Sequence, residues 1–480
     1  MVSDALDTRS APGPVILESN RYSRSDRRAA FYVGAAVTLT YLLIQQGQVT
    51  VKDGLAMLAV SHSIVHHGTL AVAPKFGVVG SGGHYFAKYG IGLSLLAVPF
   101  VALGDLVSVV VGHKSQLEGF FAASLVPLIM GFLTASLFRT TRRLGASSRW
   151  AAVIAVGSAF GTYALPYGKD FFAEPLTTLA ILLSIEFLLS GRFELAGVAL
   201  AAAVITRPES VVLVAILPLV VWAFHGFRKA CVYGSVAAIG AILDAVYNQY
   251  RFGSVFKSGY TGEGFSTPLI HGAAGLLFSP EKSIILFAPI VIFTVLGSIQ
   301  LWRAKNRFVV VLVLTNLLVF FVLTATWHSW QGGWSWGPRL LLPGVIPTML
   351  LLSPLTRNAR RVAIGLLVAG FVVSASTIVV STRAQQLDHP APSVGPGVLR
   401  QYQLVPTVTR YTVDHLRKPH IPMDTRKSLS LWQVSLGHQL GAKGKLAGIV
   451  GSLVLLVLLL VAVRRIPIWR NHDPRSPTQH

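Results

Sequence analysis

The sequence predicts an all-α fold, a polytopic transmembrane helical bundle of about 12 spans. Of its 480 residues, 52% are hydrophobic and only 12% are charged, and the mean hydropathy is +0.60. This composition is too apolar for an ordinary soluble globule. Apolar stretches recur along the chain, and the clearest, residues 446–463, has no charge and is followed by Arg464 and Arg465.

Each predicted span is an apolar run bounded by polar, glycine or proline residues. In chain order the runs are residues 29–44, 119–138, 150–165, 171–189, 195–205, 211–224, 232–246, 284–302, 308–323, 340–352, 362–380 and 446–463. Several are shorter than the ~20 residues that cross a hydrocarbon core, so we expect their helices to extend past these limits.

Basic residues predict which side each loop faces, because cytoplasmic loops are enriched in lysine and arginine. The basic clusters occupy residues 24–28, 139–149, 227–229, 303–307, 357–361 and 464–470. All of them face the cytoplasm if residues 89–111, an apolar stretch interrupted by Pro99, Gly104 and Asp105, do not cross the membrane. We therefore expect 89–111 to lie on, or dip into, the outer face, and both termini to be cytoplasmic.

This orientation divides the chain into four parts. They are a cytoplasmic tail (1–28), a transmembrane module (29–381) with an extracytoplasmic loop of amphipathic helices (46–118), an extracytoplasmic cap (382–445), and a last helix with a cytoplasmic tail (446–480). No stretch outside the spans is long enough for a large soluble domain. The chemistry must therefore be built from loops on a helical platform.

Charge and cysteine content exclude two classes of function. The net charge of +22 comes from lysines and arginines in short loops, where they act as topology signals rather than as a nucleic-acid surface. The single cysteine, Cys231, lies in an apolar run and excludes an internal disulfide framework or a cysteine-based metal site. No small-residue cleavage site follows the first apolar run, which we interpret as a retained helix.

Asp53 is the first candidate catalytic residue. It follows the first span in the stretch TVKDGLAMLAVSHSIVHHGTL, just before an amphipathic helix. A carboxylate at this place can act as the general base for a hydroxyl substrate that arrives from outside. The alternative is a helix N-cap, in which Asp53 only accepts backbone hydrogen bonds.

Asp170 and Glu174 form a second acidic element, in YGKDFFAEPL at the outer end of a span. Their spacing predicts that they share one helix face, and carboxylates that border a membrane helix are costly and usually functional. Asp170 is therefore a second candidate for the base. In the alternative, Lys169 and Asp170 form a solvated helix start while Glu174 pairs with a basic neighbour such as Arg207.

A third group of residues can bind a phosphate or diphosphate. His84 and Lys88 follow a glycine-rich turn in GGHYFAKYGIG, Arg207 stands in TRPES between two short spans, and Arg251 and Lys257 belong to NQYRFGSVFKSGY. Cations held in such places form charge-assisted hydrogen bonds with phosphate oxygens. The alternative for Lys88 is snorkelling towards lipid phosphates.

The loop WHSWQGGWSWGPR concentrates aromatic and polar residues. It contains Trp327, His328, Trp330, Gln331, Trp334, Trp336 and Arg339. Aromatic faces stack on sugars, neighbouring polar groups bind hydroxyls, and an arginine neutralises a leaving phosphate. An interfacial tryptophan belt is the alternative, but belts rarely place four tryptophans beside Gly-Pro-Arg in one short loop.

His62 and His66 stand one helical turn apart, the spacing of two metal ligands on a helix. The sequence offers no third ligand near them. We therefore favour a polar helix face over a metal site, and expect no metal and no soluble cofactor.

The order of these elements resembles the GT-C superfamily of integral-membrane glycosyltransferases, especially the protein O-mannosyltransferase and aminoarabinose-transferase-like group. The likeness covers most of residues 29–380. The motifs that carry it are KDG, KYGIGLSLLAVPF, DFFAEPL, LAGVALAAAVITRP, YNQYRFGSVFKSGY, LLFSPEKSIILFAPI and GGWSWGPRLLLPGVIP. Two departures stand out, since many relatives carry two adjacent acids where this chain has Lys52 and Asp53, and the mannosyltransferases' large outer domain is missing.

The resemblance implies a multi-pass glycosyltransferase of the bacterial plasma membrane. It would move a sugar from a polyprenyl-phosphate-linked donor to an extracytoplasmic hydroxyl of a glycan, lipid or protein, with inversion and with Asp53 as the base. A transporter or flippase of lipid-linked saccharides is the alternative, but transporters usually show inverted repeats and broken helices, and neither is clear in this sequence. A substrate-binding pseudoenzyme or scaffold is a third possibility.

Overall fold

The computed structural model describes residues 23–333, 335–380, 405, 431–433, 436 and 441–467. The α-helices are α1 (Arg24–Ile44), α2 (Lys52–His67), α3 (Gly92–Val111), α4 (Lys114–Arg143), α5 (Ser148–Phe160), α6 (Ala164–Tyr167), α7 (Glu174–Leu189), α8 (Phe193–Thr206), α9 (Val211–His225), α10 (Phe227–Phe252), α11 (Leu269–Phe278), α12 (Ile284–Phe287), α13 (Ile292–Arg303), α14 (Arg307–Thr326), α15 (Leu342–Thr348), α16 (Arg357–Ala375) and α21 (Gly441–Arg465). Short 3-10 turns are η2 (Pro74–Phe76), η3 (Ser81–Gly83), η4 (Pro208–Ser210), η5 (Pro289–Val291), η6 (Arg339–Leu341), η7 (Met349–Leu352) and η8 (Ser376–Ile378). The strands β1 (Val78–Val79) and β2 (Tyr85–Phe86) pair antiparallel, with Val78 opposite Phe86.

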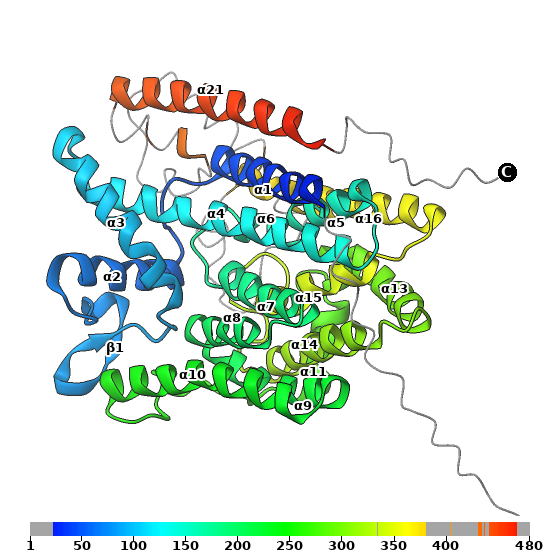
Figure 1. Ribbon diagram of the computed structural model, residues 1–480. Coiled ribbons are helices and arrows are strands. Elements are labelled where there is room, and N and C mark those ends of the chain that lie inside the picture. The colour runs from blue at the N-terminus through cyan, green and yellow to red at the C-terminus, as the bar shows by residue number, and fades with distance from the viewer. Residues whose placement is uncertain are drawn as a thin grey trace, which may run out of the picture.

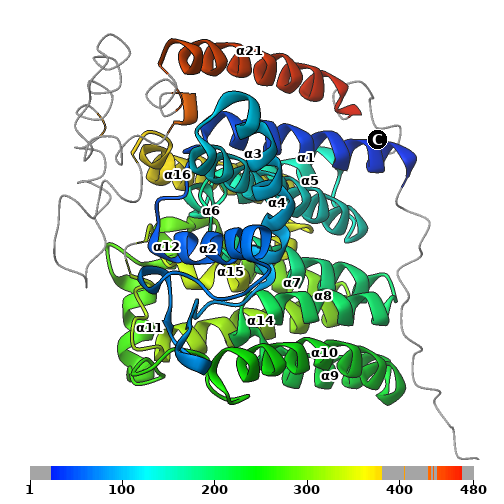
Figure 2. The same cartoon turned by 90° about the vertical axis from the view of Figure 1, so that its left-hand side faces the viewer.

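Most of the long helices run along a common direction (Figure 1). They are stacked from α21 and α1 at one edge, through α4, α7 and α8, to α9 and α10 at the other (Figure 2). The short helix α2 and the β1–β2 ribbon lie at one end of this stack (Figure 1).

Seven helical segments in the described part of the chain are long and apolar enough to cross a membrane. They are Gly92–Val111, Lys114–Arg143, Pro208–His225, Phe227–Phe252, Arg307–Thr326, Arg357–Ile378 and Gly441–Arg465. Each of the 12 predicted runs falls on helix, but several of these helices are short. The run 284–302, for example, is broken into α12, η5 and α13, because Pro289 cannot continue a helix from the preceding residues. By length and hydropathy, the described residues therefore contain seven candidate spans rather than the 12 that the sequence predicts.

The basic clusters that the structure describes meet at one end of the bundle, here called the basic end. The contacts that join them are Arg142 with Asp26, Arg143 with Ser190, Lys229 with Phe193, His225 with Phe308, and Arg360 with Trp150. Arg465 lines the same cavity as Arg24 and Arg28. This gathering of positive charge is what the alternation of basic loops predicts. The opposite end, which carries α2, is called the polar end.

Helix α3 begins and ends at the polar end. Its first residue, Gly92, lies so close to the end of α8 that an added Cβ would stand 2.3 Å from Thr206 Oγ1. Further along, a Cβ on Gly104 would stand 2.6 Å from Glu118 Cα in the first turns of α4. Although α3 is long enough for a span, it runs obliquely beside α4 (Figure 1) and does not connect the two ends. That residues 89–111 lie on one face of the membrane stays a prediction, since α3 also has the length and hydropathy of a span.

Small residues let the helices of the bundle approach closely. On α1, a Cβ added to Gly34 would stand 2.7 Å from the carbonyl oxygen of Gly131 on α4, and one on Gly131 would stand 1.9 Å from Thr38 Oγ1. Such close backbone approach increases the van der Waals contact between helices, which helps to hold them together in lipid.

Of the predicted cap, 382–445, most residues lie outside the described ones. Trp432 is described: its backbone N–H donates to Gln45 O over 2.9 Å, and its ring packs edge-on against Phe120. This part of the segment therefore covers the end of α1.

A buried ion pair at the basic end yields a first prediction. Glu186 on α7 is 4% exposed and accepts hydrogen bonds from Arg139 Nε at 2.7 Å, Arg139 Nη2 at 2.8 Å and Ser136 Oγ at 2.6 Å. Because Glu186→Ala leaves Arg139, whose side chain is 28% exposed, without its carboxylate, we expect a loss of about 1–3 kcal/mol in unfolding free energy. Unfolding of purified protein in detergent measures the loss. The exposed Glu194→Ala is the matched control, and equal stability of both variants would contradict the prediction.

Candidate active site

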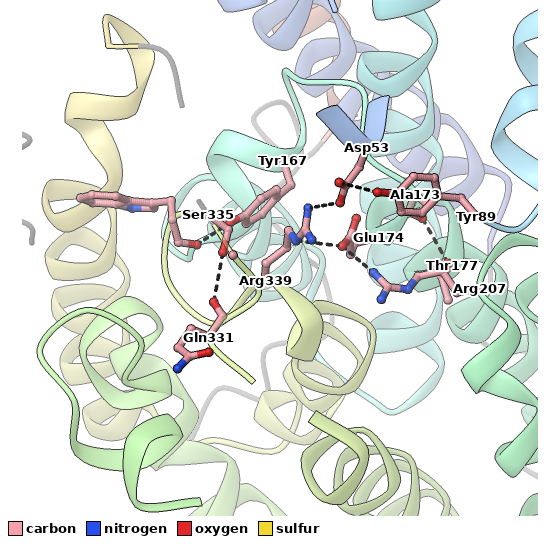
Figure 3. A network of polar contacts seen from close by, with 12 residues as sticks. Asp53, Tyr89, Tyr167, Ala173, Glu174, Thr177, Arg207, Gln331, Ser335 and Arg339 are labelled. Carbon is pink, nitrogen blue, oxygen red and sulfur yellow. Dashed lines mark hydrogen bonds and ion pairs between the residues drawn. The ribbon is translucent and has the colours of Figure 1, made fainter. Parts of the chain in front are cut away.

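Arg339 is the centre of a network of charged side chains at the polar end. It stands at the start of η6, and its Nη1 donates to Asp53 Oδ2 over 2.9 Å. Its Nε lies 3.2 Å from Glu174 Oε1, and its guanidinium faces the ring of Phe172. Figure 3 shows Arg339 between the two carboxylates, which come from α2 and α7. One arginine thus joins two helices that are distant in the sequence.

Arg207 extends the network on the far side of Glu174. Its guanidinium forms ion pairs with Glu174 and with Glu209, two residues further along the chain. Glu174 is 3% exposed at its side chain, so both of its arginine partners hold it in a poorly hydrated place. The alternative interpretation of the second acidic element, in which Glu174 pairs with Arg207, predicted this ion pair.

Asp53 is held as a carboxylate. Tyr89 Oη donates to Asp53 Oδ1 over 2.7 Å, and Arg339 occupies the other oxygen. Burial works to raise the pKa of Asp53, but Arg339, the Tyr89 hydroxyl and the charge of Lys88 outweigh it, so that the pKa lies below its usual value of 3.8. The same carboxylate, together with burial, raises the pKa of Tyr89. Asp53 is therefore ionised at neutral pH and its side chain, 27% exposed, can be reached from outside.

The N-cap alternative for Asp53 is wrong. Helix α2 begins at Lys52 and its N-cap residue is Val51, which makes no side-chain capping bond. Asp53 lies in the first turn and directs its oxygens to Tyr89 and Arg339 instead.

Lys88 is positioned beside Asp53 by the loop that follows α10. Its Nζ pairs with Glu263 and lies 4.6 Å from the centre of the Tyr260 ring. The buried Arg251 donates to the backbone carbonyls of Ala87 and Tyr89, on either side of Lys88. The snorkelling alternative therefore does not describe Lys88. Arg251, proposed above for phosphate contacts, supports the backbone that carries Lys88.

Asp170 and Glu174 do not share a helix face, contrary to the sequence prediction. Helix α7 begins at Glu174, and residues 168–173 before it are irregular. Nor is Asp170 part of a solvated helix start, since Lys169 and Asp170 are 3% and 1% exposed. Asp170 Oδ1 accepts the N–H of Phe171 over 2.8 Å, and its Oδ2 has no hydrogen-bond partner among the residues described.

The environment of Asp170 predicts a dependence of stability on pH. Burial raises its pKa to about 6, against the opposing effects of the Phe171 N–H, Lys169 and Arg339. Because the folded state binds the proton more tightly, the stabilisation is complete below the unfolded pKa of about 3.9 and is lost as pH rises through about 6, a change of about 3 kcal/mol. Unfolding temperatures between pH 4 and pH 7 should show this slope in the wild type and a smaller one in Asp170→Asn. Equal slopes would contradict it.

The remaining predicted site residues that the structure describes form no side-chain hydrogen bond or ion pair with this network. His84, Lys257 and His328 are exposed. The ring of Trp330 packs against Gly275 on α11, and its centre lies 6.1 Å from the centre of the His271 ring on the same helix. Trp334 lies outside the described residues.

The tryptophan loop therefore does not form one aromatic platform in the part that is described. Trp336 is 1% exposed and packs edge-on against Phe287. Trp327 packs edge-on against Tyr260, with ring centres 5.8 Å apart, and so borders the aromatic group around Lys88. Arg339 is the residue of this loop that enters the charged network.

Four residues of the network were not identified from the sequence. They are Tyr89, Glu209, Tyr260 and Glu263. Tyr89 directly follows Lys88 in KYG and Glu209 stands two residues after Arg207 in RPE, so nearness to these cations in the sequence was an available signal. Glu263 lies 175 residues from its partner Lys88, and no local pattern indicates such a pair.

The network holds three cations ready for an anionic group. Lys88, Arg207 and Arg339 come from three segments, and each is oriented by at least one carboxylate. Their side chains are 12–24% exposed, so a ligand can reach them. Arginine and lysine in such a poorly hydrated place bind phosphate oxygens strongly, and a nearby ionised carboxylate can accept a proton.

Comparison with known proteins gives similar structures but no sequence match. No protein-family model and no curated protein sequence matches the chain. The crystal structure of ArnT from Cupriavidus metallidurans is similar in the apo state (13% identity, TM-score 0.47, covering 91% of this chain and 75% of that one) and bound to undecaprenyl phosphate (14%, 0.45, 91% and 76%). The archaeal oligosaccharyltransferase AglB from Archaeoglobus fulgidus, in complex with an inhibitory peptide and a dolichol-phosphate, is also similar (11%, 0.44, 87% and 58%).

Proposed function

We propose that the protein transfers a sugar from a polyprenyl-phosphate-linked donor to a hydroxyl group of an acceptor, and that the charged network at the polar end is its active site. The observation that supports this best is the position of Arg339 between Asp53 and Glu174. It places a cation suited to phosphate beside a carboxylate suited to a hydroxyl proton. Loops and surface helices gather at this end, where a lipid-borne donor and a polar acceptor can meet.

In the proposed reaction the acceptor oxygen attacks the anomeric carbon of the donor sugar. The bond between that carbon and the phosphate oxygen breaks, and polyprenyl phosphate leaves with the bonding electrons. The acceptor proton passes to Asp53. Attack from the face opposite the leaving group inverts the anomeric configuration.

Arg339 gives Asp53 two states in this scheme. Without a donor, Arg339 neutralises Asp53 and keeps its pKa low, which makes Asp53 a weak base. A donor phosphate competes for the guanidinium, so its binding weakens that pair and raises the basicity of Asp53. Donor binding therefore prepares the base, and Lys88 and Arg207 share the charge that develops on the departing phosphate. Glu174 pairs with both arginines through Oε1 and orients them.

A transfer assay tests the proposal. Purified protein in lipid is incubated with a panel of radiolabelled polyprenyl-phosphate sugars and an envelope extract as acceptor. We expect at least one donor to label the acceptor. Cys231→Ala, which changes an exposed residue of α10, should label it equally. Binding of donors without transfer from any of them would exclude a transferase and favour the transport alternative.

A further inference from the structure

His62, His66 and Glu118 form a second cluster of ionisable side chains, separate from the Arg339 network. His62 Nδ1 lies 3.0 Å from Glu118 Oε2, and His66 Nε2 lies 3.0 Å from Glu118 Oε1. One donor atom from each of the three residues fits within 4.8 Å of the other two. The two histidines come from successive turns of α2 and the glutamate from the first turns of α4, 52 residues after His66.

We propose that these three side chains bind a divalent transition-metal ion of the zinc class. Ligands at about 2.0–2.1 Å from a tetrahedral ion stand roughly 3.4 Å apart, so small side-chain movements would bring the three donor atoms to that spacing. Zinc binds well to two imidazoles and one carboxylate, whereas magnesium and calcium favour sets of oxygen ligands alone. The sequence offered only the two histidines, and the third ligand becomes visible when α4 packs against α2 and α3.

Burial favours an ion over a set of plain hydrogen bonds. Glu118 is 6% exposed at its side chain and His66 is 16% exposed, which removes most of the water that would otherwise compete for the ion. His62, at 43%, leaves one side open, through which an ion can enter and a water can complete the coordination. The ring of His67 lies 6.1 Å from that of His62 and is a further donor within a short movement.

Asp105 and Lys114 both face the ring nitrogen of His66 that points away from Glu118. When Nε2 of His66 binds a metal, its Nδ1 must carry the proton, and Asp105 Oδ2 lies 3.7 Å from Nδ1. A carboxylate behind a ligating histidine fixes the ring and strengthens the ligand. Lys114 Nζ also lies 3.5 Å from Nδ1 and can only donate to it, so binding of the metal at Nε2 would require the protonated Nδ1 to turn from Lys114 to Asp105, with which Lys114 is paired at 2.9 Å.

The ion would connect the helix of Asp53 to the start of α4. His62 stands nine residues after Asp53 on α2, or ~13 Å along a straight helix, too far for the ion to take part in sugar transfer. Its effect would be to fix the far end of the helix that carries Asp53. Glu118 also packs against Gly104 of α3, so three elements of the polar end meet at this point.

Metal binding is tested directly on the purified protein, prepared without a polyhistidine tag and treated with EDTA. We expect the wild type to bind one zinc ion per chain, measured by zinc titration and elemental analysis, and its unfolding temperature to rise with zinc. Cobalt(II) should give the visible absorption of a tetrahedral site. Glu118→Gln, which keeps the size of the side chain but removes its charge and one acceptor oxygen, and His66→Ala should each weaken zinc binding by at least about tenfold.

His113→Asn is the matched control. His113 is a neighbouring exposed histidine with φ +60°, a conformation that asparagine tolerates. We expect the His113→Asn variant to bind zinc as tightly as the wild type does. No zinc uptake by the wild type, or equal uptake by the wild type and Glu118→Gln, would overturn the proposal and leave a cluster of hydrogen bonds. Because this readout does not use sugar transfer, it is independent of the proposed function.

Discussion

Asp53→Asn is expected to lower the rate of sugar transfer by about 10²–10⁴, the usual contribution of a positioned base. Asparagine has the same shape, its amide oxygen can still accept the hydrogen bond of Arg339, and its amide nitrogen can donate to the Tyr89 hydroxyl in place of accepting from it. It cannot take up the acceptor proton. Binding of the donor should remain, or become tighter, because Arg339 loses its anionic competitor. Single-turnover transfer and donor binding, measured on the same reconstituted samples, separate the two effects.

Asp170→Asn is the matched control, since it removes a second carboxylate that the sequence made a candidate base. Asp170 is 1% exposed and hydrogen-bonded to Phe171, so we expect its variant to retain transfer within a few-fold of the wild type. If Asp53→Asn transferred as well as the wild type and Asp170→Asn did not, the roles of the two residues would have to be exchanged.

Arg339→Lys is expected to produce the second large loss. Lysine keeps one positive charge but cannot contact Asp53 and Glu174 through separate nitrogens of a rigid fork, as Arg339 does at 2.9 and 3.2 Å. Removing one preorganised electrostatic contact usually lowers kcat by about 10²–10³. We expect a loss of that size in transfer, with weaker donor binding, measured by kcat and by competition with unlabelled polyprenyl phosphate.

Two further variants separate charge from folding at Arg339. Arg339→Ala leaves Asp53 and Glu174 without a shared cation, and should lower the unfolding free energy by about 3–5 kcal/mol. Arg192→Lys, at an exposed position, should leave both transfer and stability unchanged. Full activity of Arg339→Lys would mean that a simple positive charge suffices and that the bridge between the two carboxylates has no role.

The helices could be predicted from the sequence because hydropathy is a local property. The runs that became α4, α14 and α21 are continuous and apolar, and the alternation of basic loops correctly placed the described clusters at one end of the bundle. The start of α7 was not predicted correctly. Pro175 is a signal for it, because proline favours the first turn of a helix. That one shift separated Asp170 from Glu174.

The contacts of the candidate site could not be predicted in the same way. Asp53 and Arg339 are 286 residues apart, and Lys88 and Glu263 are 175 apart. A single sequence shows which residues carry charge, but the pairing depends on how the helices pack. For the same reason Glu118 could not be assigned to His62 and His66, and the tryptophans of residues 327–336 could not be divided between packing and the border of the site.

A mass balance of the wild-type reaction distinguishes sugar transfer from transport of the donor. The purified protein is placed in sealed vesicles with one radiolabelled donor and the acceptor, and polyprenyl phosphate, glycosylated acceptor and the donor in each leaflet are all measured in a single turnover. Sugar transfer predicts that polyprenyl phosphate and glycosylated acceptor appear in equal amounts. Donor that changes leaflet while the acceptor stays unlabelled would contradict the account and identify a transporter.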